Sequence, residues 1–472
     1  MTAAVLVAIL LPQAPSTAAS AGAPRLQVRA ARSNVELTRR EGRPVWLDLG
    51  VALASLDAPF DVRVQRDSYD DPLRVWQALH TPGDVTLEEL PADVLDGWNG
   101  FTEFLRIKLF SLDGRLLRQR TSTICPAGWE MQRVDDSGPF DPTYPFGCYG
   151  SPFTLGTVWG IDQGWAIFPD WMTDLSVKVP DGDYRAVVSI TRRYRELFAV
   201  DPADASVELA VNIRTRDGCR HCEGPAMPDV LGERAGLTAA PVVDDPDPAT
   251  VVDLVALPAF SIGTNREQGR DLLSFGSNVW NRGPASLVVE GFRVDDQDLM
   301  EAWQYFLDGD TIVGKALIGS FEFDDRLGHH HWHFRHFAKY RLLDASMAKA
   351  VRSHKQSFCL APTDSIDLTV GGAVWRPEDI GFSRCGWSSN ALWIREVMPT
   401  GWGDTYYQWA GGQAFDITNV PNGTYWIEVR ANPLGALYDA DPTNDTELRE
   451  VILGGRAGAR TVSVPPWHGI DD

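Results

Sequence analysis

The stretch YRAVVSI at residues 184–190 alternates apolar and polar side chains with a period close to two. Side chains that alternate in this way lie on opposite faces of a β-strand, so one face is buried and the other meets water. Similar short runs occur at residues 45–49 (VWLDL) and 60–64 (FDVRV), and Gly, Pro and Asp separate them. This pattern is typical of an antiparallel β-sandwich. We predict such a domain over residues 22–216 and, because it holds no cluster of catalytic residue types, an accessory or substrate-positioning role for it.

Residues 217–250 are rich in Pro, Ala and Asp and show no sustained period, which predicts a linker. Strand-like runs follow, among them LVVEGFRV (287–294) and GTYWIEVR (423–430), and no long amphipathic helix or internal repeat is evident. The sequence therefore predicts an all-β protein with few helices, built from two antiparallel β-sandwich-like domains. The second domain is expected over residues 251–456, with a C-terminal tail at 457–472.

The charge of the chain limits its partners. Its 472 residues include 43 Lys+Arg and 64 Asp+Glu, which gives a formal net charge of −21 at pH 7. Nucleic acids and anionic membranes bind to basic faces, so we expect neither as a partner. The same long-range field attracts ammonium groups and weakens as salt is added. The sequence carries no signal for an oligomeric state.

The N-terminus resembles an export signal. The apolar run from Val5 to Leu11 precedes Ala19-Ser20-Ala21, an A-x-A-like cleavage site, so residues 1–21 are expected to be a signal peptide. No other segment approaches the roughly 18 apolar residues that a membrane span requires. We therefore expect a secreted, extracellular protein.

Cysteine usage agrees with export. The six cysteines fall into three local pairs, namely Cys125/Cys148, Cys219/Cys222 and Cys359/Cys385. Paired cysteines in an exported protein predict disulfides. The Cys219/Cys222 pair is also compatible with a redox motif or half of a zinc site, but no second C-x-x-C is present to complete four zinc ligands.

Five of the nine histidines lie in the string GHHHWHFRHF at residues 328–337. In a strand His329, His331 and His333 share one face, and neutral imidazoles are ligands for Cu, Zn, Fe and Ni. Residues 329 and 333 are about 13 Å apart in a straight strand, so the strand must bend or the rings must lean inward to share one ion. The trio His330, His333 and His336 would suit a helix instead, but the aromatic neighbours favour a strand.

An ordered series of motifs follows this histidine string. It comprises YRLLDA (340–345), HKQSFCL (354–360), GDTY (403–406), QAFDITNV (413–420) and DADPTND (439–445). Together with H-x-H-x-H, this series resembles the catalytic domain of the lysyl oxidases, which are copper amine oxidases that act on peptidyl lysine. The resemblance covers roughly residues 250–455 and does not extend to the N-terminal 215 residues.

The resemblance implies roles for five residues. His329, His331 and His333 lie where the family binds copper. Lys355, in HKQSFCL, and Tyr406, in GDTY, lie where the family forms its self-derived cofactor, lysine tyrosylquinone. Lysine is scarce in this chain, which strengthens the assignment of Lys355. The implied cofactor would also be a covalent link between two distant segments.

The implied reaction is the oxidation of primary amines, such as peptidyl lysine, to aldehydes with O2, with release of ammonia and hydrogen peroxide. A general base must remove a proton from the carbon beside the amine nitrogen. Asp404 and Asp416 are the candidates, and the sequence does not choose between them.

The resemblance also implies a calcium site that joins the two ends of the domain. The candidate ligands are Asp253, Leu254, Asp439, Asp441, Asn444 and Asp445. Carboxylates, an amide and a backbone carbonyl are the hard oxygen ligands that Ca²⁺ prefers. The alternative for the acidic loop is an Asp/Asn turn without a metal.

Two other functions are compatible with the histidines. The first is a non-catalytic extracellular copper-binding β-sandwich protein, and the second is a zinc hydrolase with three His ligands and an open water position. The chain also departs from the family pattern, with Gly328 where the family has a cysteine and with fewer cysteines between Lys355 and Tyr406. These departures bear on loop geometry and substrate specificity.

Overall fold

The computed structural model describes residues 22–30, 32–128, 131–134, 137–139, 142–148, 150–169, 175–215, 240–293, 299–309, 311–324, 331–352, 357–377, 385 and 393–470. The predicted signal peptide, His329, His330, Lys355, Cys219 and Cys222 lie outside these residues. Within them the regular secondary structure is almost entirely strand, with one α-helix, α1 (Arg192–Leu197), and short 3-10 helices. The predicted all-β class is confirmed. None of the described helices is long and apolar enough to cross a membrane.

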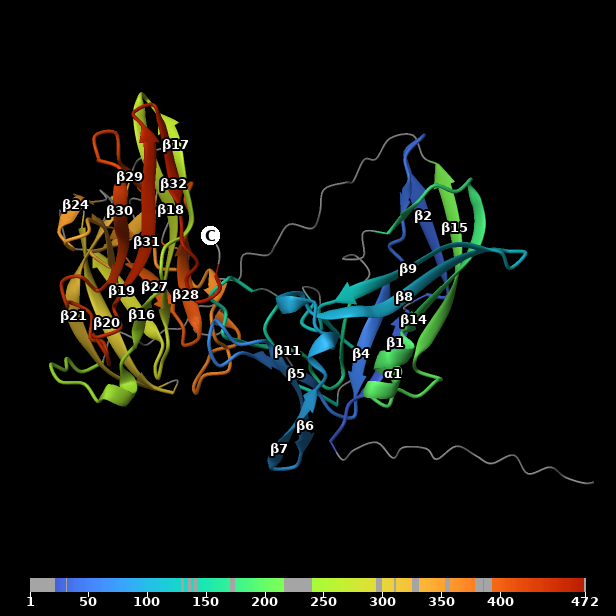
Figure 1. Ribbon diagram of the computed structural model, residues 1–472. Coiled ribbons are helices and arrows are strands. Elements are labelled where there is room, and N and C mark those ends of the chain that lie inside the picture. The colour runs from blue at the N-terminus through green and yellow to red at the C-terminus, as the bar shows by residue number, and fades with distance from the viewer. Residues whose placement is uncertain are drawn as a thin grey trace, which may run out of the picture.

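Three sheets and a short ribbon build the N-terminal region, defined here as residues 22–215 (Figure 1, blue to green). One sheet has the order β1 (Arg25–Ala30), β4 (Val51–Leu56), β12 (Trp165–Ile167) and β10 (Met131–Arg133). The second has the order β11 (Gly156–Ile161), β5 (Phe60–Gln65), β6 (Arg74–Thr81) and β7 (Asp84–Leu90). The third has the order β2 (Asn34–Arg39), β15 (Ser206–Thr215), β14 (Gly182–Ile190), β8 (Phe101–Ser111) and β9 (Leu116–Ile124), and the ribbon pairs β13 (Ser176–Val177) with β3 (Val45–Trp46).

The alternating runs of the sequence become strands of this region. In β14 the buried positions alternate with more accessible ones, as YRAVVSI predicts, and the strand pairs antiparallel with β15 and β8. The run at 45–49 forms only a two-residue strand, which pairs with β13. Leu47 extends this pairing by one backbone hydrogen bond, from its N–H to the Leu175 carbonyl (2.9 Å), and its side chain is buried. β15 pairs with β2 in parallel, so this sheet is mixed.

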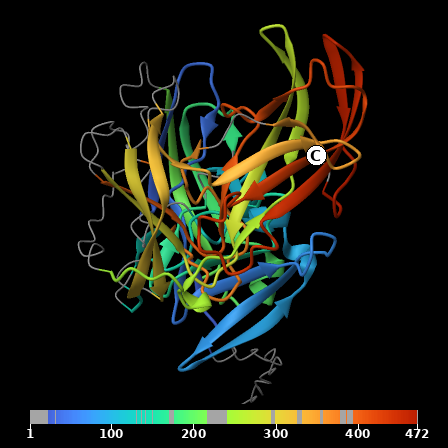
Figure 2. The same ribbon diagram turned by 90° about the vertical axis from the view of Figure 1, so that its left-hand side faces the viewer.

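Three further sheets build the C-terminal region, defined here as residues 240–470 (Figures 1 and 2, yellow-green to red). The first has the order β16 (Leu254–Ala256), β18 (Arg270–Asn281), β28 (Trp402–Tyr406) and β26 (Asp364–Ser365), and β17 (Phe260–Glu267) and β29 (Ala414–Asp416) also pair with β18. The second has the order β25 (Ser357–Phe358), β22 (His331–Arg335), β21 (Thr311–Asp324), β20 (Leu299–Asp308), β19 (Leu287–Arg293) and β27 (Trp393–Met398). The third has the order β24 (Lys349–Arg352), β23 (Ala338–Leu343), β30 (Gly423–Ala431), β31 (Thr446–Arg456) and β32 (Ala459–Ser463).

Each region has its own main hydrophobic core. One core draws its buried side chains from Leu26 to Ile213, and the other draws them from Val252 to Leu453. Each core is closed by sheets from its own part of the chain, as Figure 1 shows. The division into separate domains with a linker at 217–250 stays a prediction, since most of that segment lies outside the described residues.

Two of the predicted disulfides are confirmed. Cys125 is bonded to Cys148, and Cys359 is bonded to Cys385. The second bond lies in the C-terminal region and ties the residue after β25 to a segment that precedes β27. This bond anchors the backbone on which the candidate site is built.

Candidate functional site

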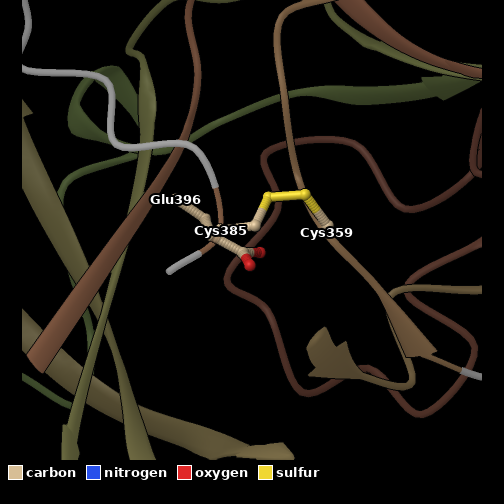
Figure 3. A group of neighbouring side chains, drawn as sticks. All are labelled: Cys359, Cys385 and Glu396. Atoms are coloured by element: carbon tan, nitrogen blue, oxygen red, sulfur yellow. A yellow bond between two sulfur atoms is a disulfide. The ribbon is translucent and has the colours of Figure 1, made fainter. Parts of the chain in front are cut away.

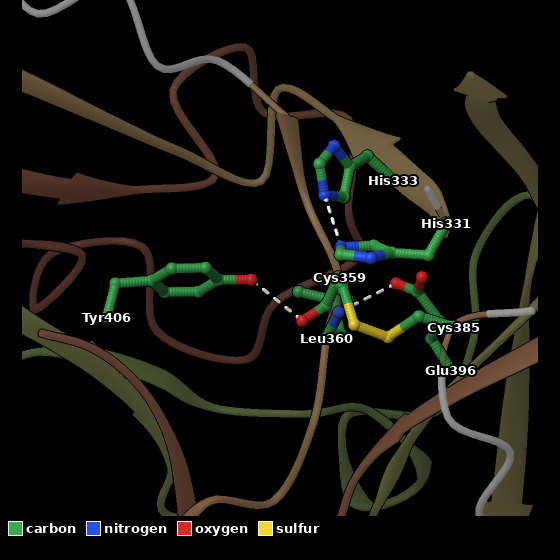
Figure 4. The surroundings of a disulfide bond; sticks show 7 residues. All are labelled: His331, His333, Cys359, Leu360, Cys385, Glu396 and Tyr406. Carbon is green, nitrogen blue, oxygen red and sulfur yellow. Dashed lines mark hydrogen bonds between the residues drawn. A yellow bond between two sulfur atoms is a disulfide. The ribbon is translucent and has the colours of Figure 1, made fainter. Parts of the chain in front are cut away.

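The histidine string forms a strand, as predicted, over its described part. β22 contains His331 and His333 on one face, while Trp332 and Phe334 are buried in the core on the other. The Nε2 atoms of the two histidines are 2.8 Å apart, and their ring centroids are 4.5 Å apart. The alternation of His with large aromatics therefore places the two imidazoles on one face of the strand, where they point toward each other (Figure 4).

The donor chemistry of this pair fits a transition-metal ion. Two nitrogens that each lie about 2.0 Å from one ion are about 2.8 Å apart when the angle at the ion is 90°. The observed separation of 2.8 Å is close to that value. His333 is 2 % exposed, and its Nδ1 lies 3.5 Å from Asp324 Oδ2, which is within ion-pair distance. The third predicted ligand, His329, lies outside the described residues.

Tyr406 ends β28, and its ring lies beside the segment that follows the HKQ motif. The ring meets Phe358 edge-on at 5.0 Å, and the hydroxyl donates to the Cys359 carbonyl oxygen at 2.7 Å (Figure 4). Phe358 belongs to β25, which pairs directly with the histidine strand β22. The structure therefore brings Tyr406 and the histidine pair to the same short segment, which in sequence begins two residues after Lys355. Lys355 itself lies outside the described residues.

Electrostatics keep the Tyr406 phenol protonated. Burial raises the pKa of Tyr406 well above its usual value, and the nearby Asp404 and Glu396 carboxyls raise it further because they disfavour a second negative charge. Gln413, from the QAFDIT motif, donates to the Tyr406 carbonyl oxygen at 3.0 Å and to Ser277 Oγ at 2.8 Å. The motif glutamine thus fixes the backbone that carries the tyrosine.

Of the two candidate bases, only Asp404 is buried beside Tyr406. Asp404 is 3 % exposed and stands two residues before Tyr406 in β28, so both side chains lie on one face of the strand. Asp416 is exposed at the end of β29, where its carboxylate accepts hydrogen bonds from Thr418, and these lower its pKa.

Glu396 is a site residue that the sequence reasoning missed. It is fully buried in β27, and its Oε2 accepts the backbone N–H of Leu360 at 2.8 Å. Its carboxyl lies beside the Cys359–Cys385 disulfide (Figures 3 and 4). Because both sulfurs are in the disulfide, this group offers no thiolate to a metal ion. The only sequence signal was a pair of charged residues, Arg395 and Glu396, inside an otherwise apolar strand.

The raised pKa of Glu396 should make the free energy of unfolding depend on pH. Burial raises the pKa of its carboxyl well above its usual value, so the folded protein keeps a proton that the unfolded chain releases. The contribution of this group to stability is full below its unfolded pKa and is lost as pH rises toward the folded pKa, by up to about 1.4 kcal/mol per pH unit. Glu396→Gln should therefore flatten the fall in unfolding free energy between about pH 5 and pH 7.

Urea unfolding of the copper-free protein across this pH range measures the slope. Glu301→Gln is the matched control because Glu301 is exposed in β20, and it should leave the slope unchanged. A parental slope in Glu396→Gln would mean that Glu396 is ionised in the folded protein.

A second cluster joins the two ends of the C-terminal region. Val252 forms a parallel bridge with Asp439 and accepts the Ala440 backbone N–H at 2.8 Å. Leu254 donates its backbone N–H to Asp439 Oδ2 at 3.3 Å. Residues that are 185 apart in sequence are thereby brought together at one point, as the calcium prediction requires.

Three carboxyl groups, those of Asp253, Asp439 and Asp445, lie close together where the two ends of the region meet. Asp253 and Asp445 are 7 % and 6 % exposed, and Asn444 Nδ2 donates to Asp253 Oδ1 at 2.8 Å. Burial raises the pKa of both Asp439 and Asp445, and the neighbouring carboxylates raise these pKa values further. One positive charge, the half-exposed guanidinium of Arg282, lies 3.1 Å from Asp253 Oδ2.

Asp441 behaves differently from the other predicted calcium ligands. Its Oδ1 accepts hydrogen bonds from Thr443 N and Thr443 Oγ1, which lower its pKa. This is the Asp/Asn turn considered as the alternative for the loop. The turn and the carboxyl cluster occur side by side in this loop, with Asp441 serving the turn.

The sequence is similar to lysyl oxidases over part of its length. It is 30% identical over 145 residues to the protein-lysine 6-oxidases of Sus scrofa and Rattus norvegicus, which covers 29% of this chain. It is 31% identical over 138 residues to lysyl oxidase homolog 3A of Danio rerio, which covers 27% of this chain. These matches span 51%, 31% and 17% of the three relatives, respectively. No protein-family model matches the chain.

Proposed function

We propose that this protein is a secreted copper-dependent amine oxidase. It oxidises a primary amine, either peptidyl lysine or a related amine, to an aldehyde. One O2 and one water are consumed for each amine, and one ammonia and one hydrogen peroxide are released. The proposal rests on one observation above all: the histidine strand β22 and the Tyr406 ring meet at Phe358–Cys359, which belong to the same motif, HKQSFCL (354–360), as Lys355.

His329, His331 and His333 are the proposed copper ligands, and Lys355 and Tyr406 are the proposed source of lysine tyrosylquinone. Copper and the quinone would supply the redox chemistry, which takes two electrons from the amine and passes them to O2. The match to relatives covers at most about half of any of the three named above, so activity and substrate belong to this proposal rather than to the comparison.

The described side chains hold the reacting groups and move a proton. Glu396 accepts the Leu360 N–H and so fixes the backbone whose Cys359 carbonyl receives the Tyr406 hydroxyl. Asp404, on the same strand face as Tyr406, is the proposed base for the proton on the carbon beside the amine nitrogen. The Phe358 ring packs edge-on against the Tyr406 ring and so excludes water from that side of it.

The proposal is tested by peroxide release from the full chain matured with copper in air. We expect equal amounts of aldehyde, ammonia and peroxide from a simple alkylamine or a lysyl peptide. Lys355→Arg keeps the positive charge but lacks the amine that the cofactor requires, so its peroxide release should equal the blank. Release equal to that of the parent would contradict the proposed cofactor. A zinc hydrolase would give no peroxide from the parent.

We further propose that calcium is bound by the carboxyl cluster at the ends of the C-terminal region. Asp253, Asp439 and Asp445 supply the carboxylates, Asn444 an amide oxygen and Leu254 a backbone carbonyl. Its support is that buried carboxyls repel one another here while the Oδ1 atoms of Asn444 and Asp445 are buried without a hydrogen-bond partner in the described part of the chain. A divalent cation would neutralise the repelling carboxylates and bind the two Oδ1 atoms.

Calcium is expected to stabilise the folded protein. At a calcium concentration about one hundred times the dissociation constant, the gain is about 2.7 kcal/mol. Thermal unfolding in calcium and in chelator measures it, and Asp445→Asn should remove most of the difference. Asp344→Asn is the control, because Asp344 is a half-buried turn aspartate that lies outside the cluster and accepts hydrogen bonds from Ser346. Equal calcium stabilisation in all three proteins would exclude this site.

A further inference from the structure

One short segment of the C-terminal region lies between the two halves of the molecule. On one side it pairs with β28, where Thr363 donates its backbone N–H to Gly403 (3.0 Å), and Ile366 donates to Gly401, the residue before β28 (2.8 Å). On its other side it meets the N-terminal region. The backbone N–H of Leu155 donates to the Ile366 carbonyl at 2.8 Å. We call residues 363–369 the bridging segment.

The contact with β11 has the form of one more strand pairing. Leu368 donates its backbone N–H to the Gly156 carbonyl at 2.9 Å, and Gly156 and Asp367 form a parallel bridge. Since β11 is the edge of the sheet β11-β5-β6-β7, that sheet continues through the bridging segment into the sheet that contains β28. The approach depends on glycine: a Cβ on Gly156 would overlap Asp367 Oδ1 and lie 2.5 Å from Thr369 Oγ1.

Side chains reinforce this pairing. Tyr144 of the N-terminal region stacks on Trp375 with ring centroids 5.4 Å apart and an angle of 23°. Thr154 Oγ1 donates to the Ser365 carbonyl at 3.3 Å. The Asp367 carboxylate accepts hydrogen bonds from Thr369 N and Oγ1 at 2.9 and 2.5 Å. These bonds would have to break for the carboxylate to move away from a Cβ at position 156.

The bridging segment also touches the candidate site. Thr405 donates its backbone N–H to Thr363 Oγ1 at 2.6 Å, and Thr405 is the residue before Tyr406. At the upstream end, the chain reaches the bridging segment directly from Cys359, whose carbonyl accepts the Tyr406 hydroxyl. The strand that carries Tyr406 is thus linked to the N-terminal region through the bridging segment, and Cys359, whose carbonyl receives the Tyr406 hydroxyl, lies a few residues upstream of that segment.

We propose that the N-terminal region is a positioning module for Tyr406. Its strand β11 holds the bridging segment against β28, and this contact fixes the tyrosine relative to Cys359. Gly156 and Trp375 are therefore positioning residues. The structural half of the proposal stands alone, and its consequence for oxidation rests on the proposed function.

Gly156→Ala in the full chain tests the proposal. The added methyl group forces β11 away from the bridging segment, so amide exchange should rise about tenfold at Leu368 and also in the β28 peptide that contains Thr405. Gly371→Ala is the matched control, because a Cβ there meets nothing within 4 Å and the residue does not have a positive φ. Faster exchange at Leu368 with unchanged exchange in β28 would overturn the proposal.

Trp375→Ala, with Trp375→Phe as the conservative variant, provides a second test that leaves β11 intact. We expect kcat for peroxide release to fall about tenfold in Trp375→Ala with little change in KM, and Trp375→Phe to restore most of it. Unchanged kcat in both Trp375→Ala and Gly156→Ala would refute the positioning role. If the parent releases no peroxide, the proposed function fails, and the exchange measurement still decides whether β11 holds β28.

Discussion

Tyr406→Phe is expected to reduce peroxide release to the blank, a loss of at least about three orders of magnitude. The variant keeps the ring that packs on Phe358 but lacks the phenolic oxygen from which a quinone is made. It also loses one hydrogen bond to the Cys359 carbonyl, which costs about 1 kcal/mol of stability. The protein should therefore fold and bind copper while it remains inactive.

The neighbouring tyrosine is the control for this prediction. Tyr407 is 42% exposed and stacks on Trp409, with ring centroids 5.7 Å apart. Tyr407→Phe removes a phenolic oxygen one residue away and should retain parental activity. Peroxide release by Tyr406→Phe at the parental rate would exclude Tyr406 as the source of the cofactor.

His333→Asn is expected to lower copper binding from one ion per chain to almost none at micromolar copper. His333 is buried, and its Nε2 faces that of His331, so the substitution removes a preorganised side chain from the proposed copper site. We expect the dissociation constant to rise by more than about 100-fold, since loss of even an outer partner of a ligand costs 10- to 100-fold. Competition with a chromogenic chelator measures this change without an activity assay.

His336→Asn separates the two histidine trios that the sequence allows. β22 ends at Arg335, and His336 has a φ of 66°, a left-handed conformation that asparagine tolerates. His336→Asn should therefore bind copper as the parent does. Loss of copper in His336→Asn together with His333→Asn would favour the trio His330, His333 and His336 instead.

Local patterns in the sequence were sufficient to predict several strands and two disulfides. The period-two runs at 60–64 and 184–190 lie in strands, and the alternation of His with Trp332 and Phe334 predicts a strand with one apolar and one metal-binding face. Cys125/Cys148 and Cys359/Cys385 pair with their nearest cysteine in sequence. In each case the information lies within about 30 residues, where neighbours along the chain are also neighbours in space.

Contacts between distant segments could not be predicted in this way. Alternation decides which face of a strand is buried, but it does not decide which strand lies beside it. The pairing of Gly156 with Asp367 joins residues 211 positions apart, and nothing in either local sequence indicates it. The role of Glu396 could not be predicted for the same reason, because it depends on a hydrogen bond from the Leu360 N–H, 36 residues away.

The central claim is that Lys355 and Tyr406 become one covalent cofactor in the presence of copper. Peptide mass mapping of the full chain matured with copper in air tests it most directly. We predict that the peptides containing Lys355 and Tyr406 are recovered as a single cross-linked species that reacts with phenylhydrazine, and that copper-deficient His333→Asn yields them separately. Two intact linear peptides from fully copper-loaded parent protein would contradict the account.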